Sequence, residues 1–144
     1  MRTLVIVILI LGTLAFATGP KHLYERLGGK AAIEKVVDTF VDSLVKDPQL
    51  LENPTIKAAV AHAKPKRLKA RISAMVCQAT GGPCDYKGKN MRTAHAGMNI
   101  TEADWNKMVD DFVAALNKYH VPAAEQKDLL NIISTTKGDI VKKG

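Results

Sequence analysis

Four histidines and two cysteines are the residues of this chain best suited to metal binding or nucleophilic chemistry. No two histidines have the i, i+4 spacing of a helical zinc site, and none is part of a Cys-His cluster. The sequence also shows no nucleophile elbow and no glycine loop that would cradle a phosphate. Hydrolytic chemistry therefore has no evident machinery here.

His95 has different surroundings from His22, His62 and His120. It lies in a short segment between a flexible loop and a capped helix, with Met91, Met98 and Ile100 close by in sequence. An imidazole among methionine and aliphatic side chains has the surroundings of an axial haem ligand. The spacing alone fits equally well a histidine that is exposed or has its hydrogen bonds satisfied.

The two cysteines, Cys77 and Cys84, flank a turn formed by Gly81-Gly82-Pro83. They lack the C-x-x-C spacing of a redox motif and have no second ligand pair for a metal. In an oxidising compartment such a pair predicts a disulfide. A buried free thiol is the alternative.

The first residues have the pattern of an export signal. Arg2 precedes an apolar run of 14 residues, Leu4 to Ala17, and Ala15-Phe16-Ala17 supplies a signal-peptidase site. We therefore expect a signal peptide over 1–17, cleavage after Ala17, a mature domain over 18–144 and a periplasmic location. An uncleaved membrane anchor is the alternative, but a spanning helix needs about 20 residues.

The chain is basic, with 21 Lys and Arg against 14 Asp and Glu and a net charge of +7. A basic edge runs from Lys64 to Arg71. It allows a second interpretation, a small exported helical adaptor that binds acidic partners or an anionic membrane surface. Nucleic acid is not an expected partner of an exported protein.

Hydrophobic periodicity predicts an all-α domain, because no segment alternates with period two over the length of a strand. Asn53-Pro54 and Thr101 to Asp104 are typical helix starts, and Asp47-Pro48 and Gly81-Gly82-Pro83 are typical stops. We expect helices over about 33–45, 54–63, 66–80, 101–119 and 122–138, and a short segment over 91–97.

Three motifs in this order resemble those of the group I truncated haemoglobins. They are Leu23-Tyr24-Glu25-Arg26-Leu27-Gly28-Gly29, then Gly81-Gly82-Pro83 with Tyr86 and Gly88, and then the segment from Met91 to Thr101 with His95. The resemblance covers most of residues 22–141. It implies a two-over-two helical sandwich around one haem b, with His95 as the ligand of the iron.

The resemblance also implies which side chains surround the haem. Apolar contacts are expected from two helices and the His95 segment, namely Phe40, Val41, Leu68, Ile72, Met75, Met91, Ile100 and Trp105. The haem propionates are expected to meet Arg71 and Tyr86, and further along the basic edge Arg67 and Lys66. Ordinary core packing, or a solvated basic edge, is the alternative for each residue.

The chain departs from the family at the two positions that commonly carry an oxygen-binding tyrosine and glutamine, which are Val41 and Ile72 here. We therefore expect a haem protein that binds O2, NO or CO in an apolar distal pocket. No acid or base residue supports an enzyme, although slow NO dioxygenation with an unidentified reductase stays open. A six-coordinate haem protein that transfers electrons is the third interpretation.

Overall fold

The computed structural model describes residues 20–143, which fold almost entirely into helices. The predicted signal peptide, 1–17, lies outside the described residues. The pairing of extended backbone within the described part is a single bridge between Ile100 and Val141. The elements in chain order are α1 (Leu23–Arg26), α2 (Gly29–Leu44), the 3-10 turn η1 (Leu50–Glu52), α3 (Pro54–Ala61), α4 (Pro65–Ala79), α5 (Met91–Ala94), α6 (Glu102–Lys118), α7 (Ala123–Ser134) and α8 (Lys137–Ile140). The predicted all-α class is confirmed.

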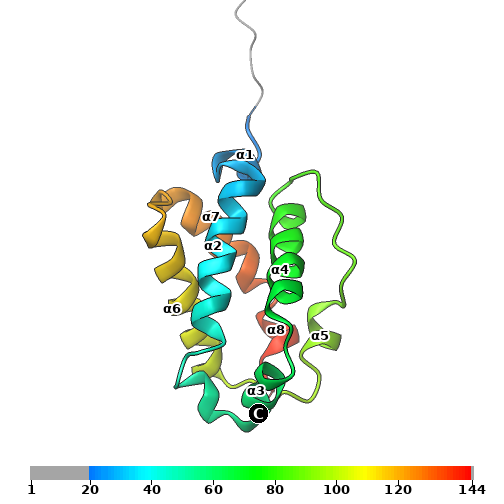
Figure 1. Cartoon of the computed structure of the whole chain (residues 1–144). Coiled ribbons are helices and arrows are strands. Elements are labelled where there is room, and N and C mark those ends of the chain that lie inside the picture. Colours follow the sequence, from blue (N-terminus) through cyan, green and yellow to red (C-terminus); the bar gives the residue numbers. More distant parts are fainter. Residues whose placement is uncertain (1–19, 144) are drawn as a thin grey trace, which may run out of the picture.

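Helix α2 is the centre of the fold, with α4 packed along one side and α6 along the other (Figure 1). The apolar face predicted from its periodicity is buried, and Val41 has no exposed surface at all. The ring of Phe40 meets the ring of Phe112 on α6 edge to face, with centroids 5.1 Å apart. This contact lies in the main core cluster, which joins α2, α4, α6 and α7.

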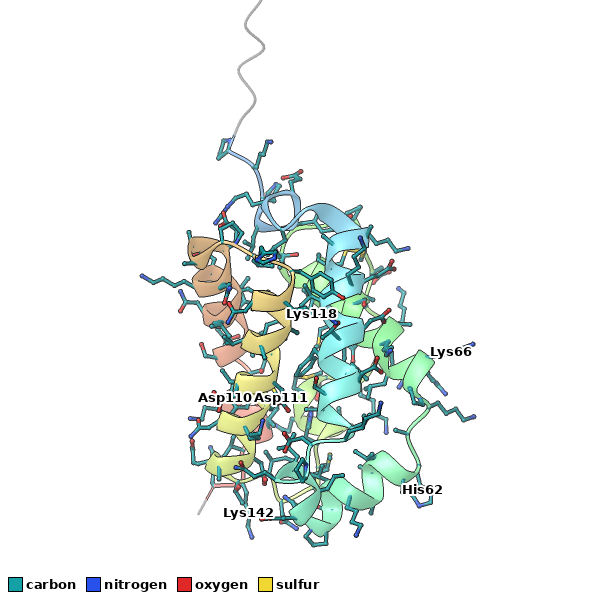
Figure 2. All side chains as sticks on the ribbon, turned by 60° about the vertical axis from the view of Figure 1, so that its left-hand side comes forward. His62, Lys66, Asp110, Asp111, Lys118 and Lys142 are labelled. Atoms are coloured by element: carbon teal, nitrogen blue, oxygen red, sulfur yellow. A yellow bond between two sulfur atoms is a disulfide. The ribbon has the colours of Figure 1, made fainter. Side chains whose placement is uncertain are left out.

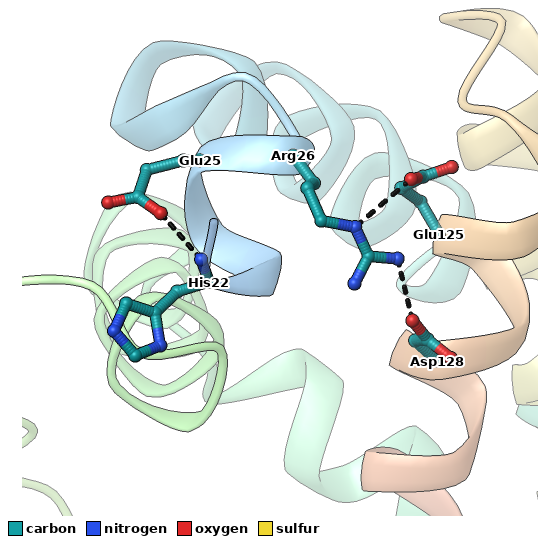
Figure 3. A network of polar contacts seen from close by, with 5 residues as sticks. All are labelled: His22, Glu25, Arg26, Glu125 and Asp128. Carbon is teal, nitrogen blue, oxygen red and sulfur yellow. Dashed lines mark hydrogen bonds and ion pairs between the residues drawn. The ribbon is translucent and has the colours of Figure 1, made fainter. Parts of the chain in front are cut away.

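Helix α1 is a single turn that polar contacts hold against α7 (Figure 3). The Arg26 guanidinium donates to Glu125 at 3.2 Å and to Asp128 at 2.6 Å. At the start of α1, the backbone amide of His22 donates to the Glu25 carboxylate at 2.6 Å. The first turn is thus held both at its own N-terminus and to a helix about 100 residues away in sequence.

The predicted helix starts are confirmed. The Asn53 side chain accepts from the amides of Thr55 and Ile56 with Pro54 in the first turn, and Thr101 and Asp104 form a capping box. These caps satisfy amides that have no partner within their own helix. Their local sequence signature therefore located α3 and α6.

The prediction of one continuous last helix was wrong, because α7 ends at Ser134 and a separate α8 begins at Lys137. Three successive hydroxyls, of Ser134, Thr135 and Thr136, each donate to the carbonyl three residues earlier, at 2.7–2.9 Å. Such side-chain bonds compete with the backbone ladder of a helix. They accompany the break between α7 and α8.

Cys77, near the end of α4, and Cys84 are joined in the structure with their Cα atoms 5.8 Å apart, a normal separation for a disulfide. Within residues 20–143, no helix is both long and apolar enough to cross a membrane.

Candidate functional site

His95 comes directly after the single turn of α5, and its imidazole is half-buried. Asn90 begins that turn by accepting from the amide of Thr93 at 2.9 Å. The Nδ1 atom of His95 lies 2.9 Å from the carbonyl oxygen of Met91. Because a carbonyl can only accept, the proton of the neutral ring must be on Nδ1. The Nε2 atom therefore keeps its lone pair and can bind a metal.

The segment after His95 is anchored to α3. The Asn53 side-chain amide donates to the carbonyl of Asn99 at 3.2 Å and to the Asp104 carboxylate at 2.9 Å, and the hydroxyl of Thr55 donates to the carbonyl of Met98. Although burial opposes it, hydrogen bonds from Thr101 and Asn53 lower the pKa of Asp104 below its usual value. Asp104 is thus held as a carboxylate.

A second set of contacts ties the same segment to α8. The Arg92 guanidinium pairs with the Asp139 carboxylate at 2.5 Å, and the amide of Lys142 donates to the carbonyl of Ile100 at 2.8 Å. Ile100 also lies in a small core cluster with Leu50 and Ile56. His95 is therefore held between α3 on one side and α8 on the other.

Three of the predicted apolar contacts, Leu68, Ile72 and Met75, are half-buried side chains of α4. The fully buried residues of that helix include Val76 and Cys77. Helix α4 packs closely on α2 but has no comparable contact with α5, α7 or α8 within the described part of the chain. In Figure 1, α2 and α5 lie on opposite sides of α4. The half-buried side chains of α4 therefore belong to a helix that is packed on one side only.

The other predicted apolar contacts divide between the core and the His95 segment. Phe40 and Val41 belong to the main core cluster, on whose margin Leu68 and Ile72 pack. Trp105 is also buried, and Met91 is half-buried. The structure thus brings the α2 and α4 candidates together, whereas Ile100 lies in the separate cluster described above.

The two predicted propionate partners have different surroundings. Arg71 is exposed and has no ion pair among residues 20–143. The hydroxyl of Tyr86 already donates to the carbonyl of Lys89 at 2.7 Å. Tyr86 therefore has no proton left for a carboxylate, and Arg71 is the better donor. On the same edge, Lys69 is turned to α2, where its ammonium pairs with Asp42 at 2.9 Å.

The remaining histidines, His22, His62 and His120, are exposed. Nowhere in residues 20–143 do three His, Cys, Asp or Glu side chains gather as a metal cage. His95 could therefore serve only a metal that brings most of its ligands with it. The sequence did not predict the role of Asn53 and Thr55 in holding this segment, because their partners are more than 40 residues away.

A cavity of about 400 Å³ lies between α2, α6 and α7, and its lining is mainly apolar, including Val37, Val76 and Phe112. Neither His95 nor Ile72 lines it. It offers no charged side chain other than Lys35 at its margin. This cavity is distinct from the arrangement around His95.

Comparison with known proteins gives a consistent result. The model of the family described as bacterial-like globin matches residues 22–142. The chain is similar to a group 1 truncated hemoglobin of Nostoc sp., at 30% identity over 121 residues, 84% of this chain and 98% of that protein. It is 27% identical to that of Tetrahymena pyriformis over 124 residues, 86% of this chain and 98% of that protein. The solved structure of the Tetrahymena pyriformis truncated hemoglobin in its Fe(III) form is similar with a TM-score of 0.72 and 26% identity, over 85% of this chain and all of that one.

Proposed function

Because the chain belongs to the bacterial-like globin family, whose truncated haemoglobins bind haem and gas, we propose that His95 holds the iron of a b-type haem. The observation that carries this proposal is the bond from His95 Nδ1 to the carbonyl of Met91, which leaves Nε2 free. A hydrogen bond at the second nitrogen is what orients metal-binding imidazoles in proteins. The porphyrin supplies four ligands, so one histidine is enough.

The residues around His95 suit an apolar, planar group. Leu68, Ile72 and Met75 on α4, and Met91 and Met98 beside His95, are all half-buried apolar side chains. Burial of such side chains against a haem would remove further apolar surface from water and stabilise the complex. Arg71, exposed on the same helix, is the residue that would pair with a propionate.

We propose that the bound gas meets no hydrogen-bond donor on the α2 and α4 side. Val41 is fully buried and Ile72 is half-buried, and neither side chain can donate. A polar oxygen adduct gains most from such a donor, so O2 would be released quickly while CO and NO would be held better. Gas binding is therefore the proposed activity, and slow NO dioxygenation would need an electron donor.

The proposed location is the periplasm, after cleavage behind Ala17. The Cys77 to Cys84 geometry supports this, because a disulfide persists in an oxidising compartment. We propose that this bond ties the end of α4 to the loop that leads to α5.

Absorption spectra of the protein with haem, compared with those of His95→Ala, test the proposal. We expect a stable Soret band in wild type that the variant loses or holds weakly, while the exposed His120→Ala control keeps it. Added imidazole should restore the band in His95→Gly. Equal haem binding by His95→Ala would refute the role of His95.

The same spectra separate the other two interpretations. A colourless wild type whose binding to acidic partners falls with salt would favour the adaptor. A low-spin ferrous spectrum with a ligand from the protein would favour the electron-transfer protein.

A further inference from the structure

The positive charge of the chain is concentrated in one segment. Residues 53–84 contain six Lys and Arg and no Asp or Glu, whereas the whole chain has a net charge of +7. This segment spans α3, α4 and the turn after α4. The remainder of the chain is therefore close to neutral, and the excess charge is a local feature of α3 and α4.

Five of the six cations project into solvent. All five are exposed and none has an ion pair within residues 20–143, and we call them the basic edge: Lys57, Lys64, Lys66, Arg67 and Arg71. The sixth, Lys69, is neutralised by Asp42 and Asp38 of α2. In Figure 2, Lys66 points away from the body of the molecule, on the side away from Asp110 and Asp111 of α6.

The basic edge does not serve the stability of its helices. Lys64, Lys66 and Arg67 surround the first turn of α4, which has no acidic residue. The N-terminal end of a helix carries partial positive charge, so cations there are unfavourable. Charges retained against this preference, and without internal partners, fit an anionic surface that comes from outside.

We propose that the basic edge is the docking surface for an acidic redox protein that reduces the haem, and this rests on the proposed function. Arg71, the proposed propionate partner, belongs to the edge. A partner seated there would therefore face the rim of the haem, where an electron must enter. Oppositely charged surfaces speed such encounters and orient the two proteins.

A lipid surface fits the basic edge less well. A helix that lies on a membrane needs an exposed apolar face beside its cations. The apolar residues of α4 are buried or half-buried, and the large hydrophobic side chain exposed in the described part is Tyr119 at the end of α6. Docking on this edge is therefore electrostatic without an apolar anchor.

The test uses a flavodoxin, an acidic FMN protein, as the probe. Its anionic hydroquinone gives one electron and becomes the neutral semiquinone, and the ferric haem iron becomes ferrous. The double variant Lys57→Glu, Lys64→Glu is compared with Lys35→Glu, Lys127→Glu. The control residues are also exposed, have no ion pair in the described part and change the net charge equally.

We expect the second-order rate of haem reduction to fall about tenfold in the Lys57, Lys64 variant at low salt, and less than about twofold in the control. The difference should disappear at about 0.5 M NaCl. Calorimetric titration of oxidised flavodoxin should show the same order of affinities without electron transfer. Equal effects in both variants would overturn the proposal. It would also fail if anionic phosphatidylserine vesicles, but not flavodoxin, distinguished the variants.

The haem spectrum, recorded first, keeps this result separate from the proposed function. Should wild type take up no haem, the proposed function fails, and the calorimetric titration still decides whether flavodoxin binds through Lys57 and Lys64. Should all variants take up haem equally and flavodoxin ignore the edge, only the docking proposal fails.

Discussion

Replacing Lys107 with methionine should destabilise the protein more than any other single lysine change on α6. The Lys107 ammonium lies 2.8 Å from Asp47 Oδ2 and 2.5 Å from Asp111 Oδ1. Only 24% of the Lys107 side chain and 10% of each aspartate side chain are exposed. The second Asp111 oxygen, Oδ2, is buried with no hydrogen-bond partner in the described residues. Lys107 is therefore the main compensation for two nearly buried carboxylates.

The magnitude follows from this burial. Removing one partner of a buried ion pair costs about 3–5 kcal/mol, because the other charge stays buried without compensation. Since about a quarter of the Lys107 side chain reaches solvent, we expect a loss of about 2–4 kcal/mol in the free energy of unfolding at pH 7. Asp47 keeps its bonds from the amides of Gln49 and Leu50 in the variant.

The pH dependence has a definite sign. The hydrogen bond from Lys107 lowers the pKa of Asp47 in the folded protein, although burial opposes it. A carboxyl with a lowered pKa stabilises the fold above its unfolded pKa of about 3.9, and this stability is lost as the pH falls through the lower folded pKa. In Lys107→Met the uncompensated carboxylates bind protons more readily. The deficit against wild type should therefore shrink between pH 7 and about pH 4.5.

Urea unfolding followed by circular dichroism at the two pH values measures this deficit. Lys118→Met is the matched control on the same helix, where Lys118 is exposed and has no ion pair within the described part (Figure 2). The control should cost less than about 0.5 kcal/mol. Equal losses in the two variants, or a Lys107→Met deficit that is constant with pH, would refute the reasoning.

Three further changes test other parts of the structure. Asn53→Ala should lower the unfolding free energy by about 1–2 kcal/mol in urea, because it removes the cap of α3 and the bonds to Asn99 and Asp104. Cys77→Ser with Cys84→Ser should lower it by about 2.5 kcal/mol, as loop closure predicts for a sequence separation of 7, and a reductant should have the same effect on wild type only. Ile72→Gln should slow O2 release at least about tenfold in flash photolysis, because it adds a donor worth about 1.4 kcal/mol or more; unchanged release would argue against an apolar gas site.

The sequence predicted those parts of the fold whose signals are local. The apolar residues of α2 and α6 recur with helical period, and Asn53-Pro54 and Thr101 to Asp104 mark helix starts by side chains within three residues of the backbone groups that they bind. The break after Ser134 has a local cause too. Whether a hydroxyl bonds back to its own helix or points to solvent depends on backbone detail that periodicity does not record.

The motif around His95 indicated the residue but not its geometry. Tyr86 fitted the propionate role by position, yet its hydroxyl donates within its own loop. Asn53 was expected to cap α3, yet its amide also reaches Asp104, which is 51 residues later. Bonds over such separations depend on how α3 and α6 are placed, and no short pattern in the sequence encodes that placement.

The orientation of His95 is a property of the whole fold. Helix α5 has four residues, and an isolated turn of that length is unstable in water. The bond from His95 to Met91 exists only while that turn exists. The turn in turn depends on the Asn90 cap, on Arg92 with Asp139, and on the anchoring of the following chain to α3. Weakening these distant anchors should therefore loosen the imidazole before it unfolds the core, since the core cluster of α2, α4, α6 and α7 includes none of them.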